Sequence, residues 1–111
     1  MDINIQQFKH CALINVKGRV DSYTASKLSD AIDSVNKNGC FKIILDLKEL
    51  EFMSSAGLRA LLIGQRTCKR YNRGELVLAA VPKKVYDAIE LAGFVPLFNF
   101  YENTTTAVGH F

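Results

Sequence analysis

The chain has 111 residues, of which 49% are hydrophobic and 23% are charged, and its formal net charge is +3. This balance predicts one folded domain over residues 1–111, with an apolar core. The charge is mild and the basic residues are scattered, which argues against nucleic-acid binding. No apolar run approaches the roughly 20 residues that cross a bilayer, and the first residues lack a signal-peptide pattern. We therefore expect a cytoplasmic protein without a membrane partner.

The cysteines and histidines are not spaced as in metal sites or disulfide frameworks. They are Cys11, Cys40, Cys68, His10 and His110. Zinc sites and disulfide frameworks need closely spaced sets of ligands or thiols, and the spacing here is wide. We therefore expect reduced thiols and neither a metal nor another cofactor.

The first forty residues predict a hairpin followed by a helix. Apolar and polar residues alternate at 3–5 and again at 12–16, with a reversal at 9–10, which is typical of two short antiparallel strands. Apolar residues then recur at helical spacing over 25–35. Asp21 or Ser22 is the expected N-cap, and the Asn-Gly pair at 38–39 is expected to end the helix.

Strands and helices are expected to alternate over the remaining residues. Strands are predicted at 41–45, 76–80 and 97–100, and helices at 55–71, at 82–92 with Pro82 in the first turn, and at 103–108 with Asn103 as cap. Residues 46–53 are expected to be a connection, and Asn72, Arg73 and Gly74 to end the second helix. Strands separated by helices imply right-handed crossovers. The predicted fold is a single α/β domain with a mainly parallel sheet of about five strands, one antiparallel edge strand and about four helices.

Ser54 and Ser55 stand at the predicted start of the second helix. A serine there can cap the helix, attack an electrophile or accept a phosphoryl group. Ser55, Asp87 and His110 follow the chain order of a hydrolase triad, but the first glycine of a nucleophile elbow is missing and His110 is the penultimate residue. On chemistry alone, capping is the favoured role, and a small serine hydrolase is an alternative.

The stretch around the two serines resembles the signature of STAS domains, specifically that of bacterial anti-sigma factor antagonists. It is Asp46-Leu-x-x-Leu-x-Phe-Met-Ser-Ser-Ala-Gly-Leu-Arg-x-Leu-Leu. The turn at 18–21, followed by Ala25 and Leu28, resembles that family's Gly-x-Leu-Asp turn and first helix. Since the predicted order of elements also matches, the resemblance covers nearly the whole chain.

The resemblance implies a switched binding protein and no enzymatic activity. In that family the antagonist binds an anti-sigma factor, which is itself a serine kinase of the histidine-kinase-like ATPase fold, and so frees a sigma factor. The kinase phosphorylates the serine two residues before the motif glycine, which is Ser55 counted from Gly57, and a PP2C-type phosphatase removes the phosphate. Ser54 and Ala56 depart from the residues often found beside the acceptor, and Ser54 is a second possible acceptor.

A partner surface is expected around the acceptor serine, because the two loops involved should lie at the same end of the sheet. The predicted contact residues are Asp21, Ser22, Tyr23, Thr24, Met53, Ser54, Ala56, Gly57, Leu58 and Arg59. Leu58 is equally well interpreted as a core residue rather than a partner contact. Tyr23 is equally well interpreted as an ordinary half-exposed aromatic residue. A STAS subunit of a signalling scaffold or transporter complex, without phosphorylation, is the alternative function among binding proteins.

Overall fold

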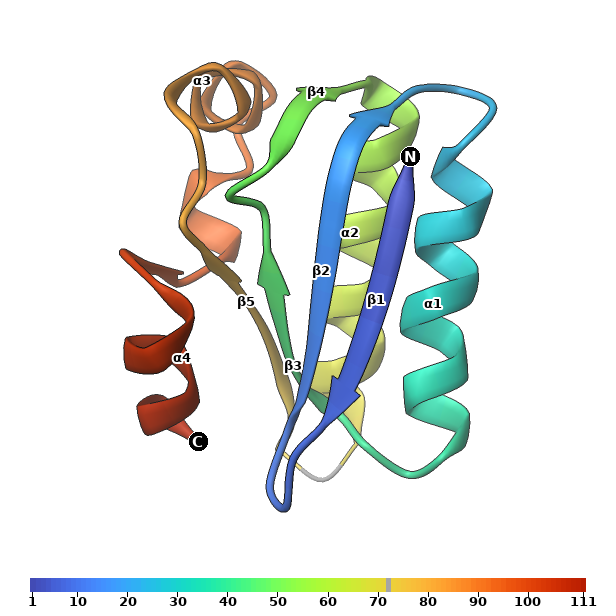
Figure 1. Cartoon of the computed structure of the whole chain (residues 1–111), viewed down its shortest axis with the longest axis vertical. Helices are drawn as coiled ribbons and strands as arrows, with labels where there is room; N and C mark the ends of the chain where they lie inside the picture. The colour runs from blue at the N-terminus through green and yellow to red at the C-terminus, as the bar shows by residue number, and fades with distance from the viewer. Residues whose placement is uncertain (72) are drawn as a thin grey trace.

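A six-stranded sheet with four α-helices around it makes up the part of the chain that the computed structural model describes, residues 1–71 and 73–111 (Figure 1). The elements are β1 (Asp2–Gln7), β2 (Ala12–Val20), α1 (Ala25–Lys37), β3 (Lys42–Asp46), β4 (Leu50–Met53), α2 (Ser55–Arg70), β5 (Glu75–Ala79), α3 (Lys83–Leu91), the 3-10 helix η1 (Val95–Leu97), β6 (Phe100–Tyr101) and α4 (Thr104–His110). The predicted α/β class is confirmed.

The strands are parallel except at one edge. Their order is β1-β2-β3-β5-β6, and β1 and β2 form the antiparallel pair, while the other pairs of described strands are parallel. The long strand β2 changes partner along its length. Its first part pairs with β3, and its last part, Gly18–Val20, pairs with β4, with a register shift between Gly18 and Arg19. The predicted hairpin and antiparallel edge strand are therefore present.

Two apolar clusters lie on opposite faces of the sheet. Helices α1 and α2 lie side by side against one face, where they cover the larger cluster, to which α3 adds Val85 and Ile89 (Figure 1). Helix α4 covers the smaller cluster on the other face with Ala107. Strands β3 and β5 lie under both clusters, which explains why they are apolar almost throughout rather than alternating.

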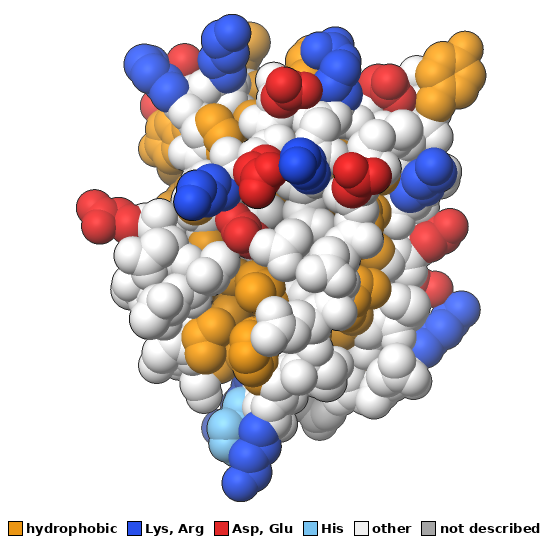
Figure 2. Space-filling view, in the orientation of Figure 1, with side chains coloured by type: hydrophobic (Ala, Val, Ile, Leu, Met, Phe, Trp, Pro, Cys, Tyr) orange, Lys and Arg blue, Asp and Glu red, His pale blue; other side chains and the backbone are white. Residues whose placement is uncertain are grey.

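Charged side chains of both signs are interspersed on the face of the molecule that looks away from α1 and α2. Figure 2 shows them over its upper half, and Lys17 and Glu49 form an ion pair of 3.1 Å between β2 and the residues before β4. Both side chains are largely exposed, so this pair contributes little to stability.

Two segments differ from the sequence prediction. Residues 46–53 contain the strand β4 rather than a simple connection, which makes six strands instead of about five. Only its two end residues are buried, so it lacks the alternation that marks a strand, and its extended form depends on pairing with β2. Residues 97–100 were predicted as a strand, but Pro96 lies in η1 and the following strand is only Phe100–Tyr101.

Helix ends follow the predictions closely at most positions. Helix α1 ends at Lys37 with Asn38 as its C-cap, and Gly39 adopts φ +88°, as a glycine after a helix end does. Helix α2 ends within one residue of the prediction, while Asn72, named as part of its stop, lies outside the described residues. Asn103 caps α4 by accepting the Thr106 N–H at 2.8 Å.

The starts of α1 and α3 come later than predicted. Thr24 is the N-cap of α1 and makes no side-chain cap bond, so neither Asp21 nor Ser22 holds that position. Pro82 is the N-cap of α3 rather than a first-turn residue. The reason at α1 is local: the Asp21 carboxylate accepts hydrogen bonds inside a separate turn before the helix.

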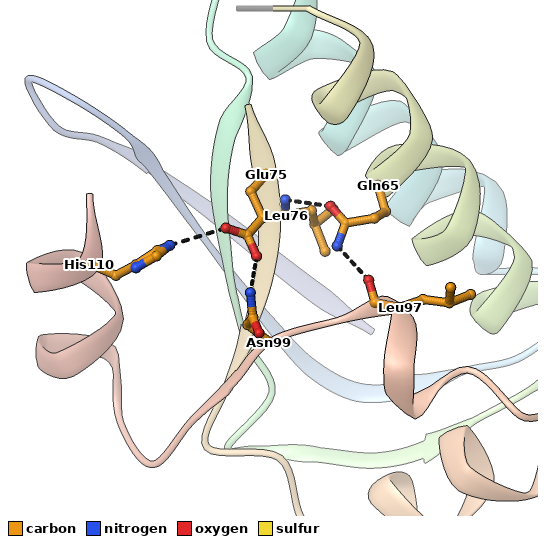
Figure 3. Close-up of polar contacts among 6 residues, drawn as sticks. All are labelled: Gln65, Glu75, Leu76, Leu97, Asn99 and His110. Carbon is orange, nitrogen blue, oxygen red and sulfur yellow. Dashed lines mark hydrogen bonds and ion pairs between the residues drawn. The ribbon is translucent and has the colours of Figure 1, made fainter. Parts of the chain in front are cut away.

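Gln65 is a buried polar side chain that joins α2 to β5 and η1 (Figure 3). It is 3% exposed; its Oε1 accepts the Leu76 N–H at 2.8 Å and its Nε2 donates to the Leu97 carbonyl at 2.8 Å. The oxygen and the nitrogen of the side-chain amide therefore each have a hydrogen-bond partner. Through the Leu97 carbonyl, Gln65 sets the position of the segment after α3 relative to α2.

Replacing Gln65→Met should destabilise the domain. The backbone groups of Leu76 and Leu97 would lose their partners while buried volume stays similar, so we expect the free energy of unfolding to fall by about 1–3 kcal/mol. Urea unfolding followed by circular dichroism measures this. The control Gln6→Met changes an exposed strand residue and should stay within about 0.5 kcal/mol. Equal stability of the two variants would contradict the role of Gln65.

Candidate functional site

The start of α2 is fixed to the carboxyl end of β2. The Ser54 N–H donates to the Val20 carbonyl at 2.8 Å, so the loop before α2 and the loop between β2 and α1 lie side by side. The predicted adjacency of these two loops is present. Both loops follow the carboxyl ends of parallel strands, where the binding sites of open α/β folds are commonly found.

Ser54 and Ser55 have different surroundings. Ser54 is half-buried at the N-cap, and its Oγ accepts the Gly57 N–H at 3.2 Å. Ser55 is the first residue of α2 and is exposed, and its hydroxyl has no hydrogen bond within residues 1–71 and 73–111. Capping therefore belongs to Ser54, while the Ser55 hydroxyl faces solvent.

Gly57 allows α2 to lie close to β2. A Cβ built on Gly57 would collide with the Met53 sulfur and come within 2.7 Å of Val20 Cγ1. Val20 is fully buried and belongs to the main core, so it has little room to yield. A glycine two residues after Ser55 is thus needed for the contact that positions the two loops.

The loop between β2 and α1 is ordered by its own polar groups. The Asp21 carboxylate accepts the backbone N–H groups of Tyr23 and Thr24, both at 2.9 Å, and the Thr24 hydroxyl donates to the Arg19 carbonyl at 3.0 Å. The bond from Thr24 is the main cause that lowers the pKa of Asp21 below the usual carboxyl value. This fixed turn leaves the Tyr23 side chain 89% exposed.

Only part of the predicted partner surface is accessible. Met53, Gly57 and Leu58 are buried beneath the loops, and little of them is exposed to a partner. The exposed predicted residues are Ser22, Tyr23, Ser55, Ala56 and Arg59, and the half-buried ones are Asp21, Thr24 and Ser54. For Leu58 the core alternative is the one that the structure supports.

A shallow hollow of about 280 Å³ beside Ser55 was not predicted. Leu62 of α2, and Ala92 and Phe94 from the segment after α3, complete its lining. Ala92 and Phe94 are far from Ser55 in the sequence, and no local pattern marks them. Tertiary packing alone brings them to the site.

The residues of the alternative hydrolase triad are not assembled. His110 Nε2 lies 3.1 Å from Glu75 Oε1, at the amino end of β5 (Figure 3). Ser55, in contrast, follows the carboxyl end of β4. Strands β4 and β5 run in the same direction, so His110 and Ser55 lie at opposite ends of the strands. Asp87 pairs with Lys83 on α3 at 3.2 Å. The serine hydrolase alternative is therefore wrong.

Other site chemistries find no support in the described residues. Residues 1–71 and 73–111 contain no group of three or more side chains able to hold a metal ion. In the same part of the chain, the helices are too short or too polar to span a membrane. All three cysteines are free, and burial raises the pKa of the Cys68 thiol to about 11, which keeps it protonated and unreactive.

Comparison with known proteins identifies the family. A family model for the STAS domain matches residues 2–107. The chain belongs to the STAS domain family. This STAS domain is 23% identical to an anti-sigma F factor antagonist of Paenibacillus polymyxa, over 97% of this chain and 92% of that protein. It is 30% identical to an anti-sigma-B factor antagonist of Listeria monocytogenes, over 72% of this chain and 69% of that protein.

Solved structures share the fold of this STAS domain. The unphosphorylated form of the anti-sigma factor antagonist SpoIIAA superposes with a TM-score of 0.80 at 16% identity, covering 95% of this chain and 92% of that one. The phosphorylated form of SpoIIAA from Bacillus gives 0.76 at 16% identity, covering 98% of both chains. The family match and the names of the relatives confirm the resemblance found in the sequence, and the family consists of binding proteins rather than enzymes.

Replacing Gly57→Ala should destabilise the domain by overpacking. The added methyl group meets Met53 and Val20, and we expect the free energy of unfolding to fall by about 1–3 kcal/mol in urea unfolding. The matched control is Gly109→Ala in α4, where a Cβ meets nothing within 4 Å. Stability of that control should be unchanged or slightly higher. A Gly57→Ala protein as stable as wild type would contradict the close approach.

The turn at Asp21 should lose its stabilising effect in acid. Because the folded pKa of Asp21 is lowered, its contribution is present above the unfolded value of 3.8 and is lost as the pH falls through the folded value. Wild type should therefore exceed Asp21→Ala in stability at pH 7, and the difference should shrink below pH 3.8. Urea unfolding at several pH values measures this. A difference independent of pH would contradict the assignment.

Proposed function

We propose that this STAS domain is an anti-sigma factor antagonist whose binding is switched by phosphorylation of Ser55. The observation that carries the proposal is the division between the two serines: Ser54 caps α2, and the exposed Ser55 hydroxyl is left free to react. The names of its relatives in Paenibacillus and Listeria support antagonism of an anti-sigma factor. The existence of SpoIIAA in unphosphorylated and phosphorylated forms supports the switch.

The proposed chemistry needs only an accessible hydroxyl on this chain. A partner serine kinase of the histidine-kinase-like ATPase fold transfers the γ-phosphoryl group of ATP to Ser55 Oγ, so that ADP leaves and the hydroxyl proton passes to a base of the kinase. A PP2C-type phosphatase reverses the state by hydrolysis and releases inorganic phosphate. Because both reactions use cytoplasmic substrates, we propose that the protein acts there.

The switch is electrostatic. A phosphoserine carries about −1.5 to −2 charges at pH 7, at a position that is neutral before modification. At the first residue of α2 the helix dipole favours this charge, so the domain should stay folded. A partner surface packed against Ser55 would instead face an uncompensated charge, and the complex should dissociate.

The proposed partner surface consists of the exposed residues around Ser55. They come from the start of α2 and from the loop before α1, which the bond between Ser54 and Val20 holds together. Ala56 and Arg59 lie on α2, while Ser22 and Tyr23 lie on the loop before α1. Tyr23 has the features of a binding anchor, since an aromatic side chain has few rotatable bonds and its backbone lies in an ordered turn.

Substitutions of Ser55 should separate binding from folding. We expect Ser55→Ala to bind the anti-sigma factor and to resist phosphorylation, and Ser55→Asp to stay folded but bind at least about tenfold more weakly, because it places a charge in the interface. Titration calorimetry measures the affinities, and circular dichroism checks the fold. Equal affinity of Ser55→Ala and Ser55→Asp would refute the switch.

Ser54→Ala is the matched control for the choice of acceptor. Loss of the cap should lower the free energy of unfolding by about 1 kcal/mol, while phosphorylation by the kinase continues. Intact mass and peptide mapping of residues 49–59, on protein from its native cells, identify the modified serine. Phosphate on Ser54 would keep the switch and move its site. A protein that is never modified and resists the kinase would favour the scaffold alternative.

A further inference from the structure

The hollow beside Ser55 is formed by two elements that meet at this position. Its residues are Ser55, Leu58, Arg59, Leu62, Ala92 and Phe94, and its volume is about 280 Å³. One wall is the first two turns of α2, and the other is the segment that follows α3. Gln65 holds these walls together through its bond to the Leu97 carbonyl. The hollow is therefore a fixed feature of the fold.

Both walls of the hollow carry apolar side chains, Leu62 on α2 and Ala92 and Phe94 on the segment after α3. Phe94 and Leu62 are half-buried, and Ala92 is exposed. Leu91, next to Ala92 at the end of α3, is 91% exposed. An isolated exposed leucine is ordinary, but one beside an apolar hollow extends the surface that a partner could cover.

Of the described residues that line the hollow, Arg59 alone is charged, and α2 has no acidic residue to balance that charge. The helix carries Arg59, Arg66, Lys69 and Arg70 and no acidic residue. Among residues 1–71 and 73–111, no carboxylate lies within ion-pair distance of Arg59. A partner that covers this wall would gain from placing a carboxylate against Arg59.

Ser55 and Arg59 are one helical turn apart on the same helix. Side chains four residues apart on a helix lie about 5–6 Å from each other at Cβ, and both of these line the same hollow. A phosphate on Ser55 would be within reach of the Arg59 guanidinium, which can pair with phosphate oxygens through two parallel hydrogen bonds.

We propose that the hollow is the docking pocket for the anti-sigma factor, which inserts one apolar side chain between α2 and the segment after α3 and pairs a carboxylate with Arg59. Phosphate on Ser55 then takes Arg59 away from that carboxylate and blocks the mouth of the hollow. This inference rests on the proposed function and extends it. It commits to an acidic partner surface because Arg59 and the charge of α2 favour one.

The partner contact is tested with two variants and a matched control. The probe is the kinase identified by phosphorylation of Ser55, and its affinity for each unphosphorylated protein is measured by titration calorimetry. Arg59→Gln removes the cation, and Ala92→Gln fills the hollow from an exposed position. We expect each to weaken binding at least about tenfold. Arg66→Gln makes the same charge change on the same helix, outside the hollow, and should change affinity less than about threefold.

The outcomes separate this inference from the proposed function. If Ser55→Asp loses binding while Arg59→Gln and Ala92→Gln bind like wild type, the switch stands and the docking pocket is overturned. If Ser55→Asp binds like wild type, the switch itself fails. If Arg59→Gln and Arg66→Gln weaken binding equally, the loss of affinity reflects the overall charge of α2, and the specific role of Arg59 is overturned.

The capture of Arg59 by phosphate is tested without any partner. Three proteins with phosphoserine at position 55 are titrated by phosphorus NMR. They are the parent, which has no other change, and the parent with Arg59→Gln or with Arg66→Gln. A neighbouring cation lowers the second pKa of the phosphate, so we expect a value about 0.3 units lower in the parent than in Arg59→Gln, with Arg66→Gln near the parent. The same pKa in the parent and in Arg59→Gln would overturn the capture.

Discussion

The site depends on one backbone contact, the hydrogen bond from the Ser54 N–H to the Val20 carbonyl. It joins the carboxyl end of β2 to the start of α2 and so brings together two loops that are more than thirty residues apart in the sequence. Gly57 is required for the same contact, because any Cβ there would meet Val20. A partner surface made from both loops exists only as long as this close approach is kept.

A division of roles between adjacent serines follows from the geometry of a helix start. The N-cap side chain turns back to accept an N–H of the first turn, whereas the next residue is already helical and directs its side chain outward. Ser54 therefore stabilises α2, and Ser55 is available for chemistry. The proposed phosphate would sit on a helix end that tolerates negative charge, so modification changes the surface without opposing the fold.

Sequence patterns predicted the elements whose burial is periodic. The alternation in β2 and the helical spacing in α1 and α2 arise from burial against the main core, and both patterns correspond to the structure. Strand β4 was missed because its residues are not buried in alternation and its pairing with β2 alone makes it a strand. The strand predicted at 97–100 is shorter and begins later, because its apolar residues follow Pro96 in η1 and only Phe100 of that range pairs in the sheet.

The sequence by itself determined the family, the fold class and the position of the serine pair, because a motif and its hydrophobic periodicity are local properties. Tertiary structure decided which serine caps the helix and which predicted contact residues are accessible, and it separated His110 from Ser55. It also placed Ala92 and Phe94 beside Ser55. These results depend on which distant segments pack together, and packing against a shared core leaves no local signature in the chain.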